Sequence, residues 1–99
     1  MDALFSLNGG EATIALSGDF TFEAHRAFKI ASQQALTLPG VTSLVIDFKA
    51  VDYMDSAALG MLLLLRERFG ERPIILAQSR GTVRAVLDVA NFARLFQFA

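Results

Sequence analysis

The chain has 99 residues, of which 54% are hydrophobic and 19% are charged, and nine basic and ten acidic side chains leave a net charge of −1. This composition excludes a disordered chain, and the scattered charges lack the basic stripe of a nucleic-acid binder, so we expect no nucleic-acid partner. Without cysteine, the chain can form no disulfide, thiolate metal site or cysteine nucleophile.

The beginning of the chain predicts a β-hairpin. Two β-prone runs, Ala3–Leu7 and Ala12–Ser17, flank an Asn-Gly-Gly turn at 8–10, and asparagine and glycine tolerate the positive φ of tight turns. A loop at Gly18–Thr21 follows. Thr21 is a candidate N-cap of the next helix, because its hydroxyl could accept a hydrogen bond from a free backbone amide.

The rest of the chain alternates between helical and strand-like spacing. We expect a helix at 24–35, a strand at 43–48, a helix at 57–69, a strand at 73–77, a helix at 82–90, and a final strand or packed tail at 94–98. Strand–helix–strand units are parallel and right-handed. The order therefore predicts an α/β fold with a mixed sheet of four to five strands and helices mainly on one face. No linker or composition break interrupts it, so we expect one domain at 1–99.

Nothing in the sequence predicts a membrane segment. The longest run of apolar or small residues, 57–65, is much shorter than the about 20 residues that cross a bilayer. The N-terminus has an acid at position 2 and no long apolar run, unlike a secretory signal. We therefore expect a cytoplasmic protein without direct membrane insertion.

The expected helix at 57–69 is apolar on more than one side. At 100° per residue, one side gathers the residues that must face the sheet, namely Ala58, Leu62, Leu65 and Phe69. The half that carries Ser56 also carries Gly60, Leu63 and Leu64, where an ordinary amphipathic helix would be polar. Either another helix or the C-terminal tail covers these leucines, or they form an apolar docking strip beside Ser56.

Ser56 and Asp55 precede that helix, where serine and aspartate are usually caps. The small residues Ala57, Ala58 and Gly60 leave the approach to the Ser56 hydroxyl open. Free amides at a helix N-terminus also favour anions. A phosphate on Ser56, which adds about −1.5 to −2 charges, would be tolerated there, although Asp55 would oppose it.

Three stretches together resemble a known family. The run IDFKAVDYMDSAALGMLLLL at 46–65 resembles the signature of the STAS domain, as found in bacterial anti-sigma-factor antagonists. LSGDFTFEAHRAF at 16–28 resembles the family's second strand, loop and first helix, and VRAVLDVANFARLFQF at 83–98 its third helix and closing segment. The resemblance therefore covers nearly the whole chain.

The resemblance implies a phosphorylation switch. Ser56 would be the phosphoacceptor of a serine kinase that is also the anti-sigma factor, a serine/threonine-type phosphatase would reverse the reaction, and Asp55 would help shape the loop. The expected partner surface comprises Asp55, Ala57, Gly60, Leu63, Leu64, Asp19 and Thr21. Thr21 stands where the family often has aspartate, and Ala57 where the best-known antagonists have a second serine. The alternative that the family suggests is a constitutive STAS subunit of a lipid-transport ABC complex.

Other chemistry finds little support in the residues. A hydrolase serine needs a base and an oxyanion hole, but His25 is the only histidine and no G-x-S-x-G elbow is present. Asp47, Asp52 and Asp55 are close in sequence, yet the EF-hand spacing and its glycine are missing. No glycine-rich loop matches a nucleotide-binding fingerprint. We therefore expect neither an enzyme nor a cofactor.

Overall fold

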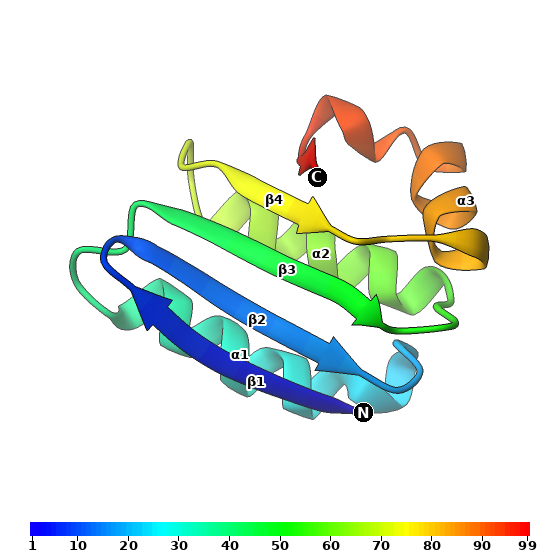
Figure 1. The fold of residues 1–99 in the computed structure, drawn as a ribbon, viewed down its shortest axis with the longest axis horizontal. Coiled ribbons are helices and arrows are strands. Elements are labelled where there is room, and N and C mark those ends of the chain that lie inside the picture. Colours follow the sequence, from blue (N-terminus) through cyan, green and yellow to red (C-terminus); the bar gives the residue numbers. More distant parts are fainter.

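The computed structural model describes all 99 residues and contains one five-stranded sheet and three α-helices. In chain order the elements are β1 (Asp2–Asn8), β2 (Glu11–Ser17), α1 (His25–Thr37), β3 (Ser43–Ala50), α2 (Ser56–Arg68), β4 (Ile74–Ala77), α3 (Gly81–Val89) and β5 (Gln97–Phe98). The strands lie in the order β1-β2-β3-β4-β5, and only the β1–β2 pair is antiparallel. The predicted α/β fold with a mixed sheet is confirmed (Figure 1).

The helices cover one face of the sheet. In Figure 1, α1 and α2 lie side by side behind the strands, and α3 lies beyond the end of β4. The strands alternate accordingly: in β3, the buried Leu44, Ile46 and Phe48 face the helices, and the residues between them are half-buried on the other face. This alternation is the pattern of a sheet with one covered face.

A single apolar cluster of 24 buried residues fills the space between the sheet and the helices. Ser32 is the only buried polar residue, and its Oγ donates a hydrogen bond to the carbonyl oxygen of Phe28 at 2.7 Å. None of the helices combines the length and the apolar character needed to cross a bilayer.

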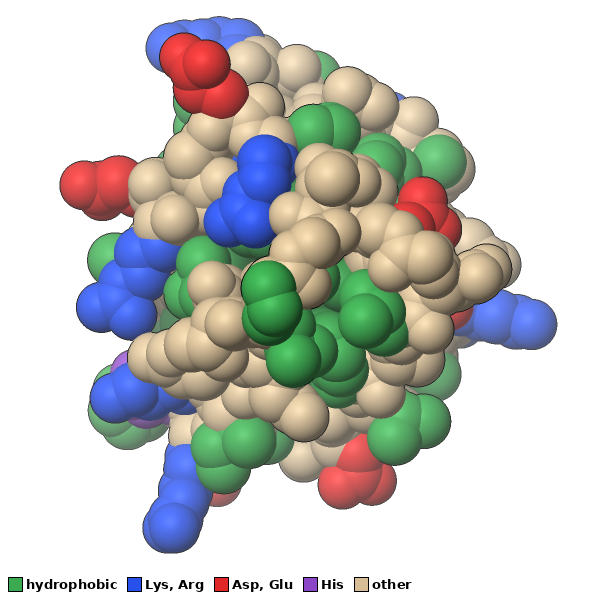
Figure 2. Space-filling model, turned by 90° about the vertical axis from the view of Figure 1, so that its left-hand side faces the viewer, with side chains coloured by type: hydrophobic (Ala, Val, Ile, Leu, Met, Phe, Trp, Pro, Cys, Tyr) green, Lys and Arg blue, Asp and Glu red, His purple; other side chains and the backbone are tan.

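Positive side chains gather on the helix side of the molecule. Figure 2 views the left-hand end of Figure 1, so that the helix layer lies at the left of the picture. Lys and Arg side chains follow most of this margin, with acidic side chains at its upper part, and the single histidine lies among the basic ones. Helix α1 itself contains His25, Arg26 and Lys29 but no acidic residue.

One joint differs from the sequence prediction, and the structure resolves the alternatives left open for the C-terminal segment. Thr21 does not cap a helix with its side chain; a 3-10 turn at Phe22–Ala24 comes before α1, and only the Thr21 carbonyl is engaged, by the Ala24 amide at 2.9 Å. The C-terminal segment is both a tail and a strand. A second 3-10 turn buries Phe92, whose ring stacks on Phe96 with centroids 5.2 Å apart, and the two-residue β5 follows.

Candidate functional site

Ser56 lies at the edge of the sheet where the parallel strands β2, β3 and β4 end. The loop after β2 and the loop after β3 are joined by backbone hydrogen bonds: the Phe20 amide donates to the Tyr53 carbonyl at 2.9 Å, and the Asp55 amide donates to the Phe20 carbonyl at 3.2 Å. An isolated parallel bridge pairs Phe20 with Met54, and both side chains are buried. The segment 51–55, called the acceptor loop below, is therefore held by the neighbouring loop.

Asp55 is the N-cap of α2. Its Oδ1 accepts hydrogen bonds from the amides of Ala57 at 3.0 Å and Ala58 at 3.2 Å, and its backbone is extended. Its Oδ2 accepts a third hydrogen bond, from the Phe22 amide at 3.4 Å. One carboxylate thus satisfies amides at the start of α2 and at the turn before α1. The sequence left the capping role open between Asp55 and Ser56, and the structure gives it to Asp55.

Ser56 is the first helical residue, is exposed, and its hydroxyl forms no hydrogen bond within the protein. Its surroundings are small: Ala57 is half-buried and Ala58 is fully buried. A Cβ added at Gly60 would find nothing within 4 Å. The absence of a side chain at Gly60 is therefore not required by packing inside the protein, and it leaves free space on the outer surface of α2.

Leu63 and Leu64 are exposed, with 42% and 50% of their surface accessible, so no other element of the chain covers them. Ala58, Leu62, Leu65 and Phe69 are buried, as the periodicity predicts. The two exposed leucines do not form one strip, however. Leu64 lines a groove between α1 and α2 together with Ala57 and Gly60, whereas Leu63 lies outside that groove.

This α1–α2 groove has a volume of about 360 Å³. Its walls come from the turn before α1 and from facing stripes of both helices: Phe22, His25, Phe28, Lys29, Ser32, Gln33, Leu36, Ala57, Gly60, Met61, Leu64, Leu65 and Arg68. Ala57, the residue after Ser56, lines the groove, so the groove opens next to Ser56. Helical periodicity could reveal the exposed leucines, but not that α1 forms the opposite wall.

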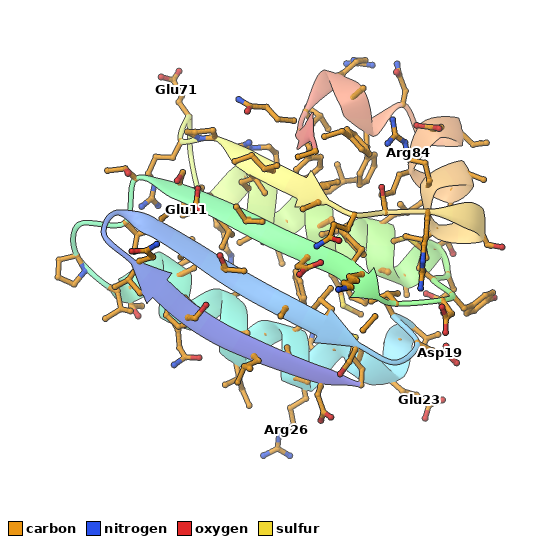
Figure 3. The ribbon with its side chains drawn as sticks, in the orientation of Figure 1. Glu11, Asp19, Glu23, Arg26, Glu71 and Arg84 are labelled. Carbon is orange, nitrogen blue, oxygen red and sulfur yellow. The ribbon has the colours of Figure 1, made fainter.

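Asp19 and Thr21 belong to the loop that precedes Phe22. Asp19 is exposed, and Figure 3 shows it projecting outward at the end of the molecule where β2 ends, as Glu23 does. Thr21 is half-buried. Because Phe22 donates to Asp55, this loop and the acceptor loop form one continuous surface. The structure thus places Asp19 and Thr21 at the same end of the fold as Ser56.

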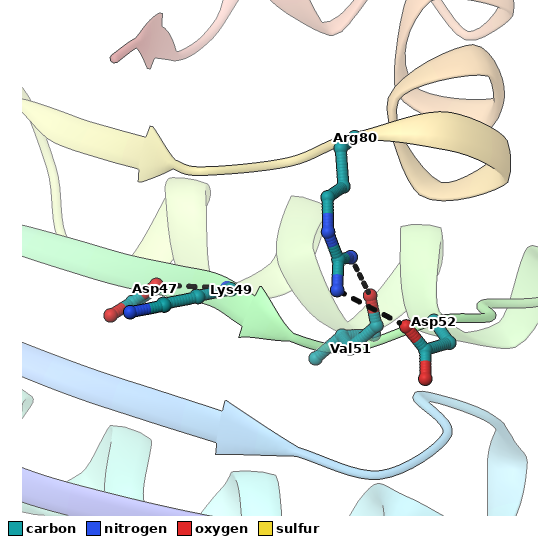
Figure 4. A network of polar contacts seen from close by, with 5 residues as sticks. All are labelled: Asp47, Lys49, Val51, Asp52 and Arg80. Carbon is teal, nitrogen blue, oxygen red and sulfur yellow. Dashed lines mark hydrogen bonds and ion pairs between the residues drawn. The ribbon is translucent and has the colours of Figure 1, made fainter.

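The three aspartates near the signature do not form a metal cluster, since each has its own partner. Asp47 Oδ1 accepts from the Lys49 amide at 2.9 Å, and Asp55 caps α2. Asp52 Oδ1 pairs with Arg80 Nη2 at 3.3 Å (Figure 4). No group of three or more potential ligands gathers anywhere in the structure.

Arg80 is a residue at this edge that the sequence reasoning missed. It immediately precedes α3, and besides Asp52 it contacts the Val51 carbonyl oxygen, with Nη1 at 3.4 Å (Figure 4). It therefore joins the loop after β4 to the acceptor loop. Both side chains of the Arg80–Asp52 pair are more than half exposed, at 57% and 83%, so the pair contributes little to stability. The sequence did offer a signal. Arg80 lies between an expected strand and the expected helix after it, and such loops lie at the edge where the parallel strands end.

His25 does not complete a catalytic site. It lies exposed in the first turn of α1, and its side chain forms no hydrogen bond. The Ser56 hydroxyl has no base bonded to it, and the nearest carboxylate along the chain, Asp55, is engaged with backbone amides. Within the protein, this hydroxyl therefore lacks the bonded base that activates a serine nucleophile.

Arg66 lies at the other end of α2 and is only half exposed. Its guanidinium donates hydrogen bonds to the carbonyl oxygens of Gly70, Arg72 and Leu95. Burial lowers the pKa of Arg66 from its ordinary value, because desolvation disfavours the charged form. This arginine is therefore a structural clamp between α2 and the C-terminal segment, and not part of the Ser56 surface.

Comparison with known proteins identifies the family. Residues 3–97 match the model of a family described as Mlab, STAS domain. The chain belongs to the STAS domain family. A STAS-domain containing protein of Pseudomonas aeruginosa (strain UCBPP-PA14) is 40% identical over 99 residues, which cover 98% of this chain and 96% of that protein.

Solved STAS-like structures show the same fold at low sequence identity. The anti-sigma factor antagonist SpoIIAA in its unphosphorylated form superposes with a TM-score of 0.75 and 17% identity, over 98% of this chain and 86% of that chain. The phosphorylated form of the Bacillus cell fate determinant SpoIIAA gives 0.73 and 19%, over 98% and 90%. An anti-sigma factor antagonist from Mycobacterium paratuberculosis gives 0.86 and 20%, over 97% and 82%.

Proposed function

We propose that this STAS protein is a phosphorylation-switched regulatory binding protein of the anti-sigma-factor antagonist type. In this proposal a single cytoplasmic domain without catalytic activity of its own docks on a serine kinase that is also an anti-sigma factor, or on a related regulator. The kinase phosphorylates Ser56, and a serine/threonine-type phosphatase removes the phosphate. Neither a cofactor nor nucleic acid takes part.

The main support for the proposal is that Asp55, and not Ser56, caps α2. A serine at a helix entrance is normally used as a cap, but here Asp55 supplies the cap and the Ser56 hydroxyl stays exposed and unbonded. A kinase could therefore modify Ser56 without breaking an internal hydrogen bond. SpoIIAA, a protein of the same fold, has a phosphorylated and an unphosphorylated form, which supports a reversible modification here.

The switch would act through charge. Phosphorylation adds about −1.5 to −2 charges at neutral pH, beside Asp55 in the sequence and at the end of the fold that also carries Asp19. Arg80, which binds the acceptor loop, is already paired with Asp52. The arginine of the neighbouring loop would therefore not be free to neutralise a phosphate in a docked interface. An unpaired charge in an interface costs about 2–5 kcal/mol, which weakens binding by about thirtyfold to several thousandfold.

The docking surface that we propose surrounds Ser56. It combines the small residues Ala57 and Gly60, the exposed Leu63 and Leu64, the cap Asp55, and the loop residues Asp19 and Thr21. Its apolar part is accessible rather than covered, which is typical of interaction sites.

Intact-mass analysis of protein purified from its native host tests the modification. We expect one phosphate mass that maps to Ser56 and disappears on phosphatase treatment. Ser56→Ala should abolish it, whereas Ser6→Ala, a change at another exposed serine on β1, should leave it unchanged. A phosphate that persists in Ser56→Ala would show that the acceptor is another residue.

Binding experiments test the switch itself. The co-purified partner should bind Ser56→Asp at least about tenfold more weakly than wild type. Equal affinity of the two proteins would contradict the charge mechanism. The alternative role, a permanent subunit of a lipid-transport ABC complex, predicts co-purification with an ATPase and a permease instead of a kinase. Such a subunit needs no acceptor, so the free hydroxyl of Ser56 favours the switch.

A further inference from the structure

We propose that the α1–α2 groove receives a helix of the partner protein that carries a row of apolar residues flanked by acidic ones. The inference rests on the proposed function, since it specifies the partner's chemistry at the surface next to Ser56. Three features support it: the apolar groove itself, the basic side chains that line it, and its continuity with the start of α2.

The groove follows the length of two parallel helices. Both α1 and α2 begin at the edge where the parallel strands end, so they run in the same direction, side by side (Figure 1). The lining residues recur at intervals of three and four along each helix: 25, 28, 29, 32, 33 and 36 on α1, and 57, 60, 61, 64, 65 and 68 on α2. At 1.5 Å per residue, the α2 wall is about 16 Å long, or roughly three helical turns.

The floor of the groove is apolar and offers no free polar group. Phe28 and Leu65 are buried at its base, and the exposed Leu64 forms part of its α2 wall. The one hydroxyl that lines the groove, that of Ser32, is already bonded to the Phe28 carbonyl. Gly60 adds no bulk and has open space where a Cβ would stand. An occupant would thus be held on this floor by apolar side chains.

The charged residues that line the groove, Lys29 and Arg68, are both basic. No acidic residue lines it, although the chain has ten acidic residues. Both side chains are exposed, and neither forms an ion pair or a side-chain hydrogen bond within the protein. Figure 2 shows the histidine among the Lys and Arg side chains of this side of the molecule. The charge of the groove is therefore available to an acidic partner.

A helix fits this geometry better than an extended segment. A strand binds by pairing with free backbone groups at a sheet edge, whereas two helices present no such groups along their sides. An amphipathic helix instead places residues at i, i+4 and i+7 into an apolar groove. Acidic residues bordering that row would then face Lys29 and Arg68.

The groove also explains how Ser56 could influence its occupant. Ala57 and Gly60 belong both to the surroundings of Ser56 and to the groove lining. A phosphate at this end would bring negative charge to the approach of an acidic helix. Phosphorylation would thus weaken binding through repulsion as well as through desolvation.

Designed peptides test the inference directly. The first probe is a synthetic amphipathic helix of about four turns with leucine at the contact positions and glutamate beside them; the second replaces each glutamate with lysine. Titrations against isotope-labelled protein carrying Ser56→Ala are followed by NMR. We expect the acidic peptide to shift the amide signals along both groove walls and to bind at least about tenfold more tightly than the basic one. Equal affinities, or shifts confined to the open sheet face, would overturn the inference.

Charge reversal on the protein provides the matched test. The double variant Lys29→Glu/Arg68→Glu should reverse the preference between the two peptides. Arg26→Glu makes the same change on α1 at a side chain that projects away from α2 (Figure 3) and should leave the preference unchanged. An unreversed preference in the double variant would overturn the inference. Decanoate provides a third arm: binding tighter than that of the acidic peptide, with the same shifts, would assign the groove to a small anionic amphiphile instead.

The two proposals can fail separately. Because the peptide titration uses Ser56→Ala protein, its outcome does not depend on whether Ser56 is ever phosphorylated. A host protein without phosphate at Ser56 would defeat the switch and leave the groove assignment standing. If the two peptides bind equally but phosphate is present at Ser56, the groove assignment fails and the switch stands.

Discussion

The two ends of α2 are held in opposite ways. At the N-terminal end a single carboxylate, that of Asp55, accepts all the side-chain hydrogen bonds, and the next side chain, Ser56, stays free. At the C-terminal end two guanidinium groups bind carbonyl oxygens of several segments. Arg66 reaches Gly70, Arg72 and Leu95, and Arg72 reaches Phe69 at 3.0 Å and Val41 at 2.8 Å.

The difference shows how one helix can be both an anchor and an accessible surface. The C-terminal end is tied to parts of the chain far away in sequence, and the Arg72 guanidinium also lies 3.7 Å from the centre of the Phe69 ring. These contacts keep the axis of α2 fixed while its first turn remains open to solvent. Changes at the C-terminal end should therefore affect stability, and changes at Ser56 should affect recognition alone.

The largest effect on stability is expected from Arg66→Met, which keeps the aliphatic stem and removes the donors. The loss of charged hydrogen bonds to three carbonyl groups should lower the free energy of unfolding by about 1.5–3 kcal/mol, measured by urea denaturation. Arg68→Met is the matched control, because the Arg68 side chain forms no hydrogen bond within the protein, so this change should alter the free energy of unfolding little. Equal stabilities of the two variants would contradict the role of Arg66 as a clamp.

Asp55→Ala should come next, with a loss of about 1–2 kcal/mol in the free energy of unfolding. It removes the cap of α2 and the link to the Phe22 amide. Asp55→Asn should restore most of the stability, since asparagine caps as well as aspartate. An unchanged free energy of unfolding in Asp55→Ala would mean that another group, such as the Ser56 hydroxyl, caps the helix. The hydroxyl would then not be free.

Two glycines of the same helix region should respond with opposite signs. Gly70 has φ of +70° just beyond α2, where an L side chain is strained, so Gly70→Ala should cost about 1 kcal/mol. Gly60 has helical backbone and open space around it, so Gly60→Ala should raise the free energy of unfolding by up to about 1 kcal/mol. Thermal melts of both variants give the comparison. Destabilisation by Gly60→Ala would indicate a close contact absent from the structure.

The smallest effect on folding is expected from Ser56→Ala. The hydroxyl has no partner within the protein, so the free energy of unfolding should change by less than about 0.5 kcal/mol. The same variant should lose the phosphate in the host. A clear loss of stability in urea denaturation would show that Ser56 is a structural residue, and would remove the main support for the switch.

Local periodicity predicted the framework of the fold and part of the site. The spacing of Ala58, Leu62, Leu65 and Phe69 is enough to assign the buried face of α2, and the leucines left over had to be exposed unless something covered them. The β-branched and apolar runs located every main strand. These features depend on neighbours along the chain, so one sequence contains them.

Contacts between distant segments were not predictable in this way. Thr21 is a reasonable cap by local rules, yet the Phe22 amide is bonded by Asp55, more than thirty residues away. The roles of Arg66 and Arg80 likewise depend on carbonyl groups and a carboxylate that only the folded chain brings near. The α1–α2 groove needs the relative placement of two helices, which helical spacing alone does not give.

The helical position of Ser56 has a consequence for any enzyme that modifies it. The residue does not belong to a flexible, extended segment, but begins the first turn of a helix that Asp55 starts and the loop before α1 supports. Helices this short are marginal in isolated peptides, so a fragment containing only the signature would present the serine differently. A kinase for Ser56 must read the shape of the folded domain instead of a linear motif. Nascent or misfolded copies would then escape modification, and the signal would be confined to molecules that are able to act on it.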